Sequence, residues 1–219
     1  MKKKHKDPQI TFMRNVKNVS MGKHVSYAWE DDPKHLVFSF SRYKFVSKML
    51  EGYKNVLEVG AGDGFQSKIV TQVVKNLYLS DIDERNIDAF NKKNKYIKKY
   101  FVHDFASKKY NMLFDAIYAL DVLEHVPKNK ENKFIKNILS SLNKEGVLIF
   151  GTPTLESQKY ASYGSKLGHI NCKTKTELKR LLKKYFNTVF MFSMNDEVIH
   201  TGYDQMSHYI FALCSNKKN

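Results

Sequence analysis

The chain has 219 residues, 42% of them hydrophobic, and a formal net charge of +15, which suits one full α/β core with short additions. It has no apolar run of 18 residues, its basic N-terminus has no apolar segment behind it, and it has two cysteines. These features exclude a membrane span, a secretory signal and a disulfide framework, and we expect a single cytoplasmic domain.

The N-terminal part is predicted to cover a ligand site formed by the rest of the chain. Residues 1–32 are polar and are expected to order over the ligand through Tyr27, Trp29, Glu30, Asp31 and Asp32. Asp32-Pro33 predicts the start of a helix whose apolar face runs from Leu36 to Leu50, and Gly52 ends it. Residues 1–50 are therefore expected to form a cover, and residues 51–219 the main domain.

The run from Val56 to Phe65 joins an apolar strand to a glycine-rich turn. The residues from Phe65 to Val74 have close to helical spacing, so Gly60, Gly62 and Gly64 are placed in a strand-to-helix turn. Such a turn lets backbone amides approach a ligand closely. A second apolar strand ends in Asp81 about 20 residues later, the offset at which a carboxylate can accept both ribose hydroxyls. The spacing predicts a nucleoside site.

Two details favour S-adenosylmethionine over a dinucleotide. The glycines follow the pattern G-x-G-x-G rather than G-x-G-x-x-G, and Glu58 precedes the first of them by two residues. An acid there would disfavour a pyrophosphate but help to balance the ammonium and sulfonium groups of S-adenosylmethionine.

Strands and helices continue to alternate after this point. Residues 100–105 predict a short strand ending in Asp104 and Phe105, which suit an adenine amino group and ring. Residues 114–126 predict a strand that leads into a loop with Asp121, Glu124 and His125. Helices are expected at 83–94, 130–142 and 174–185, the last with a Thr174/Glu177 capping box, and strands at 147–150, 189–192 and 208–213. This alternation predicts a parallel sheet with helices on both faces.

Together these signals resemble the class I S-adenosylmethionine-dependent methyltransferases, most closely the small-molecule branch with a Leu-Glu-His-Val loop after the fourth strand. The resemblance covers residues 50–155 and continues more loosely to Cys214. It implies a Rossmann-like α/β fold with a seven-stranded, mostly parallel sheet, helices on both faces, and an antiparallel edge hairpin formed by the last two strands.

The resemblance also implies a set of cofactor contacts. Position 61 is often Cys in the family and is Ala here, a mild departure because the position mainly needs a small residue. The implied contacts are Glu58, Gly60, Gly62, Asp81, Asp104 and Leu120, and we expect further contacts from Tyr27, Ala61, Gly64, Phe65, Ile82, Phe105 and Val122.

Two groups of residues are candidates for chemistry on the acceptor. His125 follows the fourth strand and suits a general base, although it could equally fix its loop by hydrogen bonding. Residues 168–171 and 195–203 concentrate polar groups and predict a substrate pocket, with His169 and His200 as further catalytic candidates and Asn171, Asp196, Glu197 and Tyr203 as binding residues. His169, Asp196, Glu197 and His200 could alternatively hold a divalent ion, but they lack a recognised metal spacing, so no metal is predicted. Residues 152–170 form a long connection that could act as a lid or a plain surface loop.

The expected acceptor is an oxygen of a small polar molecule. The loop after the fourth strand has Leu120-Asp121-Val122-Leu123 rather than an acid or amide followed by Pro-Pro, or a Pro-Cys nucleophile, which disfavours methylation of DNA bases. The positive charge comes mostly from lysine, with four arginines, so we expect a solvated surface or an acidic acceptor, such as a phosphorylated, nucleotide-linked or glycan-precursor compound, rather than nucleic acid. An RNA methyltransferase and a non-catalytic cofactor-binding module are the alternatives to this bacterial-type O-methyltransferase.

Overall fold

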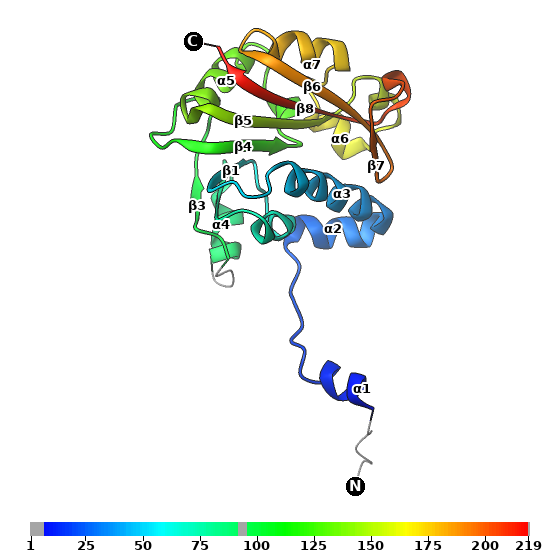
Figure 1. The fold of residues 1–219 in the computed structure, drawn as a ribbon. Coiled ribbons are helices and arrows are strands. Elements are labelled where there is room, and N and C mark those ends of the chain that lie inside the picture. Colours follow the sequence, from blue (N-terminus) through cyan, green and yellow to red (C-terminus); the bar gives the residue numbers. More distant parts are fainter. Residues whose placement is uncertain (1–6, 92–95, 219) are drawn as a thin grey trace.

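Five parallel strands form one half of the sheet (Figure 1). The computed structural model describes residues 7–91 and 96–218, and within these ranges the sheet has eight strands in the order β3-β2-β1-β4-β5-β8-β6-β7. The parallel strands are β1 (Asn55–Val59), β2 (Asn76–Asp81), β3 (Lys99–Val102), β4 (Phe114–Leu120) and β5 (Leu142–Pro153). This confirms the predicted Rossmann-like architecture with a mostly parallel sheet.

The other half of the sheet is antiparallel and corrects the predicted strand number. It contains β6 (Phe186–Asn195), β7 (Val198–His200) and β8 (Tyr209–Lys217), where β8 lies between β5 and β6. The prediction of seven strands is wrong because residues 195–203, predicted to be one polar connection, contain a short strand. Asp196 has a positive φ of 47° in a tight turn, after which Val198 and Ile199 pair with β6. The outermost strand is therefore β7.

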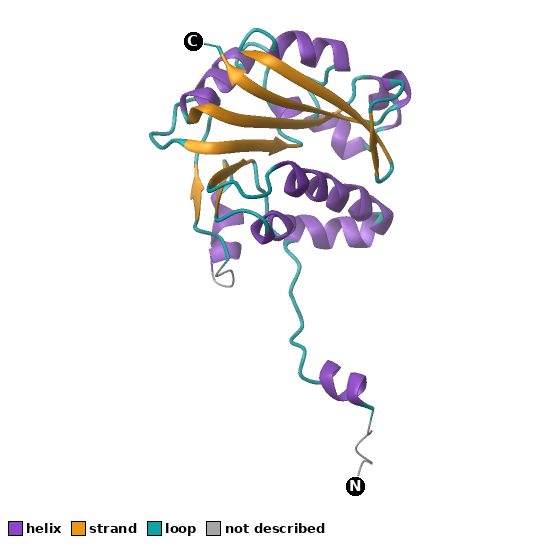
Figure 2. Cartoon of the chain, in the orientation of Figure 1, coloured by secondary structure: helices purple, strands orange, loops and turns teal. Residues whose placement is uncertain are grey.

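Helices cover both faces of the sheet (Figures 1 and 2). On one face, α5 (Glu131–Ser140) and α7 (Lys175–Leu182) bury Phe134, Ile138 and Leu182 against the strands. On the other face pack α3 (Pro33–Met49), α4 (Glu84–Asn91) and the 3₁₀ helix η1 (Gln66–Gln72). Alternate residues of β4 enter the two cores, as the pleat of a strand with two covered faces requires.

Most predicted helices are present with shifted ends. The Asp32 side chain accepts a hydrogen bond from the Lys34 amide at the start of α3, and Thr174 and Glu177 form the predicted capping box of α7. The end of the predicted 83–94 helix lies outside the described residues. The predicted 65–74 helix is instead the 3₁₀ helix η1, in a segment rich in β-branched residues, which have lower α-helical propensity.

The remaining elements are short. The expected lid region, 152–170, contains η3 (Glu156–Tyr160) and α6 (Tyr163–Gly168), while η2 (Leu123–His125) follows β4 and η4 (Asp204–Met206) precedes β8. No helix within the described ranges combines the length and the apolar composition that crossing a membrane requires.

The N-terminal helices differ in how they contact the domain. Helix α1 (Pro8–Met13) buries none of its residues and lies apart from the sheet (Figure 1), whereas α2 (Lys23–Asp31) packs beside α3 and buries Val25. The Asp63 carboxylate, from the glycine-rich turn, accepts hydrogen bonds from the amides of His24 (2.9 Å) and Val25 (3.2 Å). It thereby caps the N-terminus of α2. The predicted covering segment is thus attached directly to the turn.

Replacing Gly22 by alanine is expected to detach α2 from the turn. A Cβ at Gly22 would lie 2.2 Å from the Asp63 Cγ, so the side chain or the helix must move, at a cost of about 1–3 kcal/mol. Hydrogen exchange should show faster exchange of the His24 and Val25 amides. Gly164→Ala is the matched control, since a Cβ there meets nothing within 4 Å. Unchanged exchange in Gly22→Ala would contradict the capping contact.

Candidate active site

The strand order reverses between β1 and β4, so the connections leave this point in opposite directions. Open α/β sheets bind ligands beyond the carboxyl ends of the strands at such a reversal, and this region is the candidate crevice. Gly60 follows β1 at this point with a φ of +74°, and a Cβ there would lie 2.3 Å from Cγ2 of Val122, which follows β4. Gly62 and Gly64 also have positive φ values, of 57° and 64°. The crevice therefore begins with a turn whose backbone conformation favours glycine at each of these three positions.

The Asp81 carboxylate connects this turn to the end of β2. Its Oδ2 accepts a hydrogen bond from the Gly62 amide at 2.8 Å, and its Oδ1 accepts one from the Asp83 amide at 2.9 Å. The amides of Gly60 and Ala61 donate to the carbonyl of Ser80. Each carboxylate oxygen can accept more than one hydrogen bond, so Asp81 retains capacity for two hydroxyl donors.

Glu58 lies near the end of β1, two residues before Gly60, with 1% of its surface exposed. The Tyr43 hydroxyl donates to its Oε1 at 2.7 Å and the Tyr118 hydroxyl to its Oε2 at 2.5 Å. The ion pairs recorded for the described residues do not include Glu58. Burial without a cationic partner raises the pKa of Glu58 above its ordinary value.

Glu58→Gln is expected to remove a pH-dependent loss of stability. Because the pKa of Glu58 is raised in the folded state, its contribution to stability is present below its unfolded pKa of 4.5 and is lost as pH rises through the folded value. The variant should therefore gain stability relative to the wild type as the pH rises above about 4.5. Urea unfolding across this range measures the difference. Glu51→Gln, at an exposed position, is the control, and parallel curves for wild type and Glu58→Gln would contradict the expectation.

The other predicted cofactor positions differ in accessibility. Ile82 is 74% exposed beside Asp81, and Tyr27 is 70% exposed on α2. The Asp104 carboxylate accepts hydrogen bonds from the Ala106 amide and the Ser107 hydroxyl in its own turn. The remaining three have their side chains packed: Leu120 and Phe105 lie in the two cores, and Phe65 packs against Phe40.

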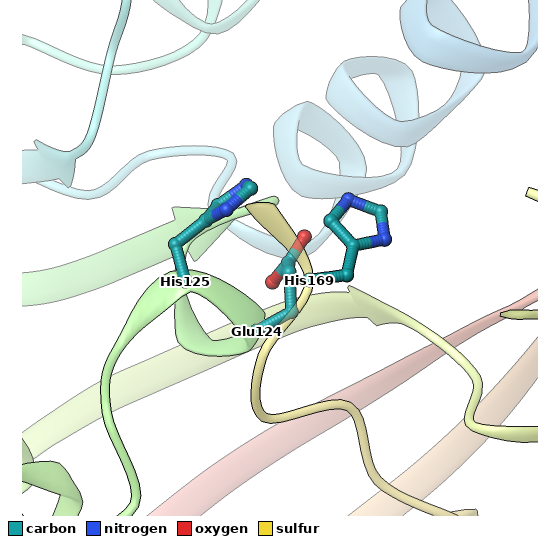
Figure 3. Close-up of side chains that lie close together, drawn as sticks. All are labelled: Glu124, His125 and His169. Carbon is teal, nitrogen blue, oxygen red and sulfur yellow. The ribbon is translucent and has the colours of Figure 1, made fainter. Parts of the chain in front are cut away.

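A cluster of three titratable side chains lies beyond the carboxyl end of β4 (Figure 3). Glu124 and His125 come from η2, and His169 follows α6; their candidate ligand atoms lie within 4.8 Å of one another. The Asn171 amide donates to the Glu124 carbonyl, and the two imidazole centroids are 5.2 Å apart. The loop after β4 and the segment after α6, which are distant in sequence, therefore meet at Glu124.

Burial decides the electrostatics of this cluster. Glu124 is fully buried; its Oε2 accepts a hydrogen bond from the Thr152 hydroxyl at 3.0 Å, and its Oε1 has no hydrogen-bond partner among the described residues. Burial, together with the nearby Asp121 carboxylate, raises the pKa of Glu124 to about 8. Burial, followed by the neighbouring His125, lowers the pKa of His169. His169 is thus favoured in its neutral form.

The two imidazole rings are held through their Nδ1 atoms. His125 Nδ1 lies 2.9 Å from the Gly168 carbonyl oxygen, and His169 Nδ1 lies 2.8 Å from Gln158 Oε1. Since both partners are oxygen acceptors, these contacts favour the tautomer with hydrogen on Nδ1 and a lone pair on Nε2. His125 is exposed, whereas His169 is half-buried.

Arg42 and Asp121 form the wall next to this cluster. Arg42 Nη1 lies 2.8 Å from Asp121 Oδ2, and the guanidinium lies 4.0 Å from the centroid of the Tyr209 ring. Asp121 has a φ of 55°, an uncommon conformation for a residue with a side chain. Arg42 is almost fully buried, so α3 is anchored to the loop after β4.

The structure does not bring all the predicted acceptor residues to the cluster. Both ring nitrogens of His200 have partners close in sequence, in Asn195 and the Gly202 amide, while Asp196 and Glu197 are exposed in the β6–β7 turn. Tyr203 is exposed and donates to Gln205. Among the described residues, the grouping with metal-ligand proximity is Glu124, His125 and His169, which corrects the alternative built on His169, Asp196, Glu197 and His200.

Asn171 is buried and holds the loop rather than facing the crevice. Its Nδ2 donates to the Val126 carbonyl and to Glu131 Oε2, and its Oδ1 accepts a hydrogen bond from Lys173 Nζ. Lys173 and Glu131 form a buried ion pair at 2.5 Å. This network fixes the segment that carries His169.

The comparisons with known proteins point to one family. Residues 21–185 match the methyltransferase domain family. A ubiquinone biosynthesis O-methyltransferase from Rickettsia canadensis is 28% identical over 115 residues, which are 51% of this chain and 46% of that protein. The match therefore spans less than half the length of that relative.

Solved structures share the fold at low identity. The N-methyltransferase NodS from Bradyrhizobium japonicum, in complex with S-adenosyl-L-homocysteine, superposes with a TM-score of 0.67 at 18% identity over 94% of this chain and 97% of that one. An S-adenosylmethionine-dependent methyltransferase from Clostridium acetobutylicum gives 0.68 at 11% identity, covering 87% and 96%.

Proposed function

The chain belongs to the methyltransferase domain family, and from this premise we propose that it transfers the methyl group of S-adenosylmethionine to an oxygen of a small polar molecule, releasing S-adenosyl-L-homocysteine. One observation carries the proposal. The glycine turn lies against Val122, and the cluster of Glu124, His125 and His169 begins two residues after Val122, at the reversal of strand order. A cofactor site and an acceptor site would then share one crevice.

The cofactor is assigned to the glycine-turn side of the crevice. Asp81 has one oxygen for each ribose hydroxyl, and exposed Ile82 provides an apolar surface for the adenine, with Asp104 near its amino group. Glu58 places a buried acid behind the turn, where it favours the positively charged amino acid part of S-adenosylmethionine. The NodS complex with S-adenosyl-L-homocysteine, on the same fold, supports this assignment.

The transfer is an in-line displacement in which an acceptor oxygen attacks the methyl carbon and the carbon–sulfur bond breaks. A hydroxyl acceptor must also lose a proton. His125 Nε2, with its ring exposed and its Nδ1 held by Gly168, is suited to take that proton. The O-methyltransferase relative favours oxygen as the acceptor atom, and an acceptor oxygen that is already anionic needs no base.

We propose that the protein acts in the cytoplasm. The acceptor is proposed to be acidic and to bind under residues 152–170. This region has exposed Tyr160, Tyr163 and Leu167 on η3 and α6, an apolar surface that suits closure over a ligand. The net charge of +15 favours an anionic partner such as a phosphorylated or nucleotide-linked metabolite.

Transfer of labelled methyl from S-adenosylmethionine into a deproteinised bacterial extract tests the proposal. Products are separated by size before and after ribonuclease treatment, and Asp81→Ala protein gives the background. Label in a small anionic fraction that resists ribonuclease is the expected result. Label in large, ribonuclease-sensitive material would replace the small-molecule acceptor by RNA. Tight cofactor binding without transfer to any fraction would favour a non-catalytic module.

A further inference from the structure

The cluster of Glu124, His125 and His169 has the composition of a divalent metal site. We propose that these three side chains bind a divalent transition-metal ion, which coordinates the acceptor oxygen during methyl transfer. The inference deepens the proposed function and rests on it. Two imidazoles and one carboxylate form a ligand set that suits ions such as Zn²⁺ or Mn²⁺, and three protein ligands leave positions open for a substrate.

The buried Glu124 carboxylate is the second observation. The residue has 0% exposure, and its Oε1 has no hydrogen-bond partner among the described residues, although buried carboxylate oxygens are normally satisfied. Figure 3 shows the carboxylate between the His125 and His169 rings. A cation between these groups would supply the missing partner.

The contacts around the cluster resemble the outer contacts of metal-binding histidines. His125 Nδ1 and His169 Nδ1 each lie within 3 Å of an oxygen acceptor, Gly168 O and Gln158 Oε1, which leaves Nε2 of both rings for a ligand. The Thr152 hydroxyl fixes the other oxygen of Glu124. The three side chains are therefore oriented by groups that are not themselves needed as ligands.

The spacing fits a cation after the ligands move inward. The ligand atoms lie within 4.8 Å of one another, and two ligands of a tetrahedral ion with bonds of about 2.0–2.2 Å are about 3.3–3.6 Å apart, so the widest separation must close by about 1–1.5 Å. His125 is exposed and can turn inward, whereas Glu124 and half-buried His169 provide the fixed side. The open side of the ion would then face the crevice.

A bound cation would take over the task assigned to His125 above. A hydroxyl that coordinates the ion has a lowered pKa and releases its proton to solvent. The new carbon–oxygen bond forms as the carbon–sulfur bond breaks, and neither the ion nor the cofactor is oxidised or reduced. Acceptors whose reacting oxygen can coordinate a cation are therefore the expected class.

Metal binding can be measured without activity. The full chain, freed of metal with EDTA and dialysed, is titrated with Mn²⁺ followed by electron paramagnetic resonance, and with Zn²⁺ followed by calorimetry. One saturable site is expected. Glu124→Gln, His125→Ala and His169→Ala should each weaken it by about 10- to 100-fold or more. His24→Ala and His200→Ala, at histidines outside the cluster, should leave it unchanged, and thermal melts of each variant check folding.

Two results would overturn the inference: absence of a saturable site, or equal binding by wild type and all three cluster variants. Parallel assays separate it from the proposed function. Methyl transfer at an undiminished rate in EDTA would refute the metal site and leave the methyltransferase standing. A metal site with the expected variant pattern, but without methyl transfer, would support the site and refute the proposed function.

Discussion

Asp81→Ala is expected to weaken S-adenosylmethionine binding by about 100-fold or more. Hydrogen bonds to a charged group contribute about 1.5–3 kcal/mol each, and the proposed site uses both oxygens of this carboxylate. The same change removes the hydrogen bond from Gly62 to Asp81 Oδ2, so the glycine turn also loses its connection to β2. Isothermal titration with S-adenosylmethionine and with S-adenosyl-L-homocysteine measures the loss.

Two variants make this test specific. Asp83→Ala removes a negative charge two residues away but leaves the bond between Asp81 and Gly62 in place, because Asp83 donates to Asp81 only through its backbone amide and pairs with exposed Arg85. Its affinity should remain close to that of the wild type. Asp81→Asn keeps the shape and should give an intermediate affinity. If Asp81→Ala bound the cofactor as the wild type does, the ribose contact would be misplaced.

His125→Ala is expected to lower turnover by about 10²- to 10⁴-fold while the cofactor affinity changes by less than about twofold. His125 lies in η2, three residues after Val122, and its exposed ring is proposed to contact the acceptor. This loss of turnover is expected for an acceptor that carries a hydroxyl proton. It is expected both if the His125 ring takes that proton and if the ring binds the proposed metal ion. Single-turnover rates with the acceptor from the extract assay, together with cofactor titration, measure the two quantities.

His200→Ala is the comparison for this variant. The His200 ring has partners at both nitrogens, Asn195 and the Gly202 amide, and is expected to affect turnover far less. Intact turnover in His125→Ala would remove the histidine from the chemistry.

Local patterns predicted the strands and the glycine turn of the first half of the sheet well. An apolar strand followed by glycines or an acid specifies backbone and side-chain placement within a few residues, which is why the turn at Gly60 and the end of β2 at Asp81 are found where expected. The same reasoning failed for β7. A strand of three residues is too short for its alternation of apolar and polar residues to be distinguished from the sequence of a polar loop.

The acceptor half depended on contacts between distant segments. His169 reaches Glu124 only because Asn171 ties its segment to the Glu124 carbonyl and to Glu131, and no spacing in the sequence indicates this. The two tyrosines that donate hydrogen bonds to Glu58 come from α3 and β4, and no spacing in the sequence predicts these contacts either. Side-chain partners across a sheet depend on register and crossovers, which a single sequence does not state.

Asp63 gives the molecule a thermodynamic connection between its N-terminus and its cofactor turn. One oxygen of this carboxylate caps α2, while the other accepts the Phe65 amide inside the turn. Any ligand that stabilises this arrangement of the turn must therefore also stabilise the docked helix, and by reciprocity a molecule that captures the free helix must weaken that ligand by the same factor. Helix α2 would then act as a reporter of occupancy.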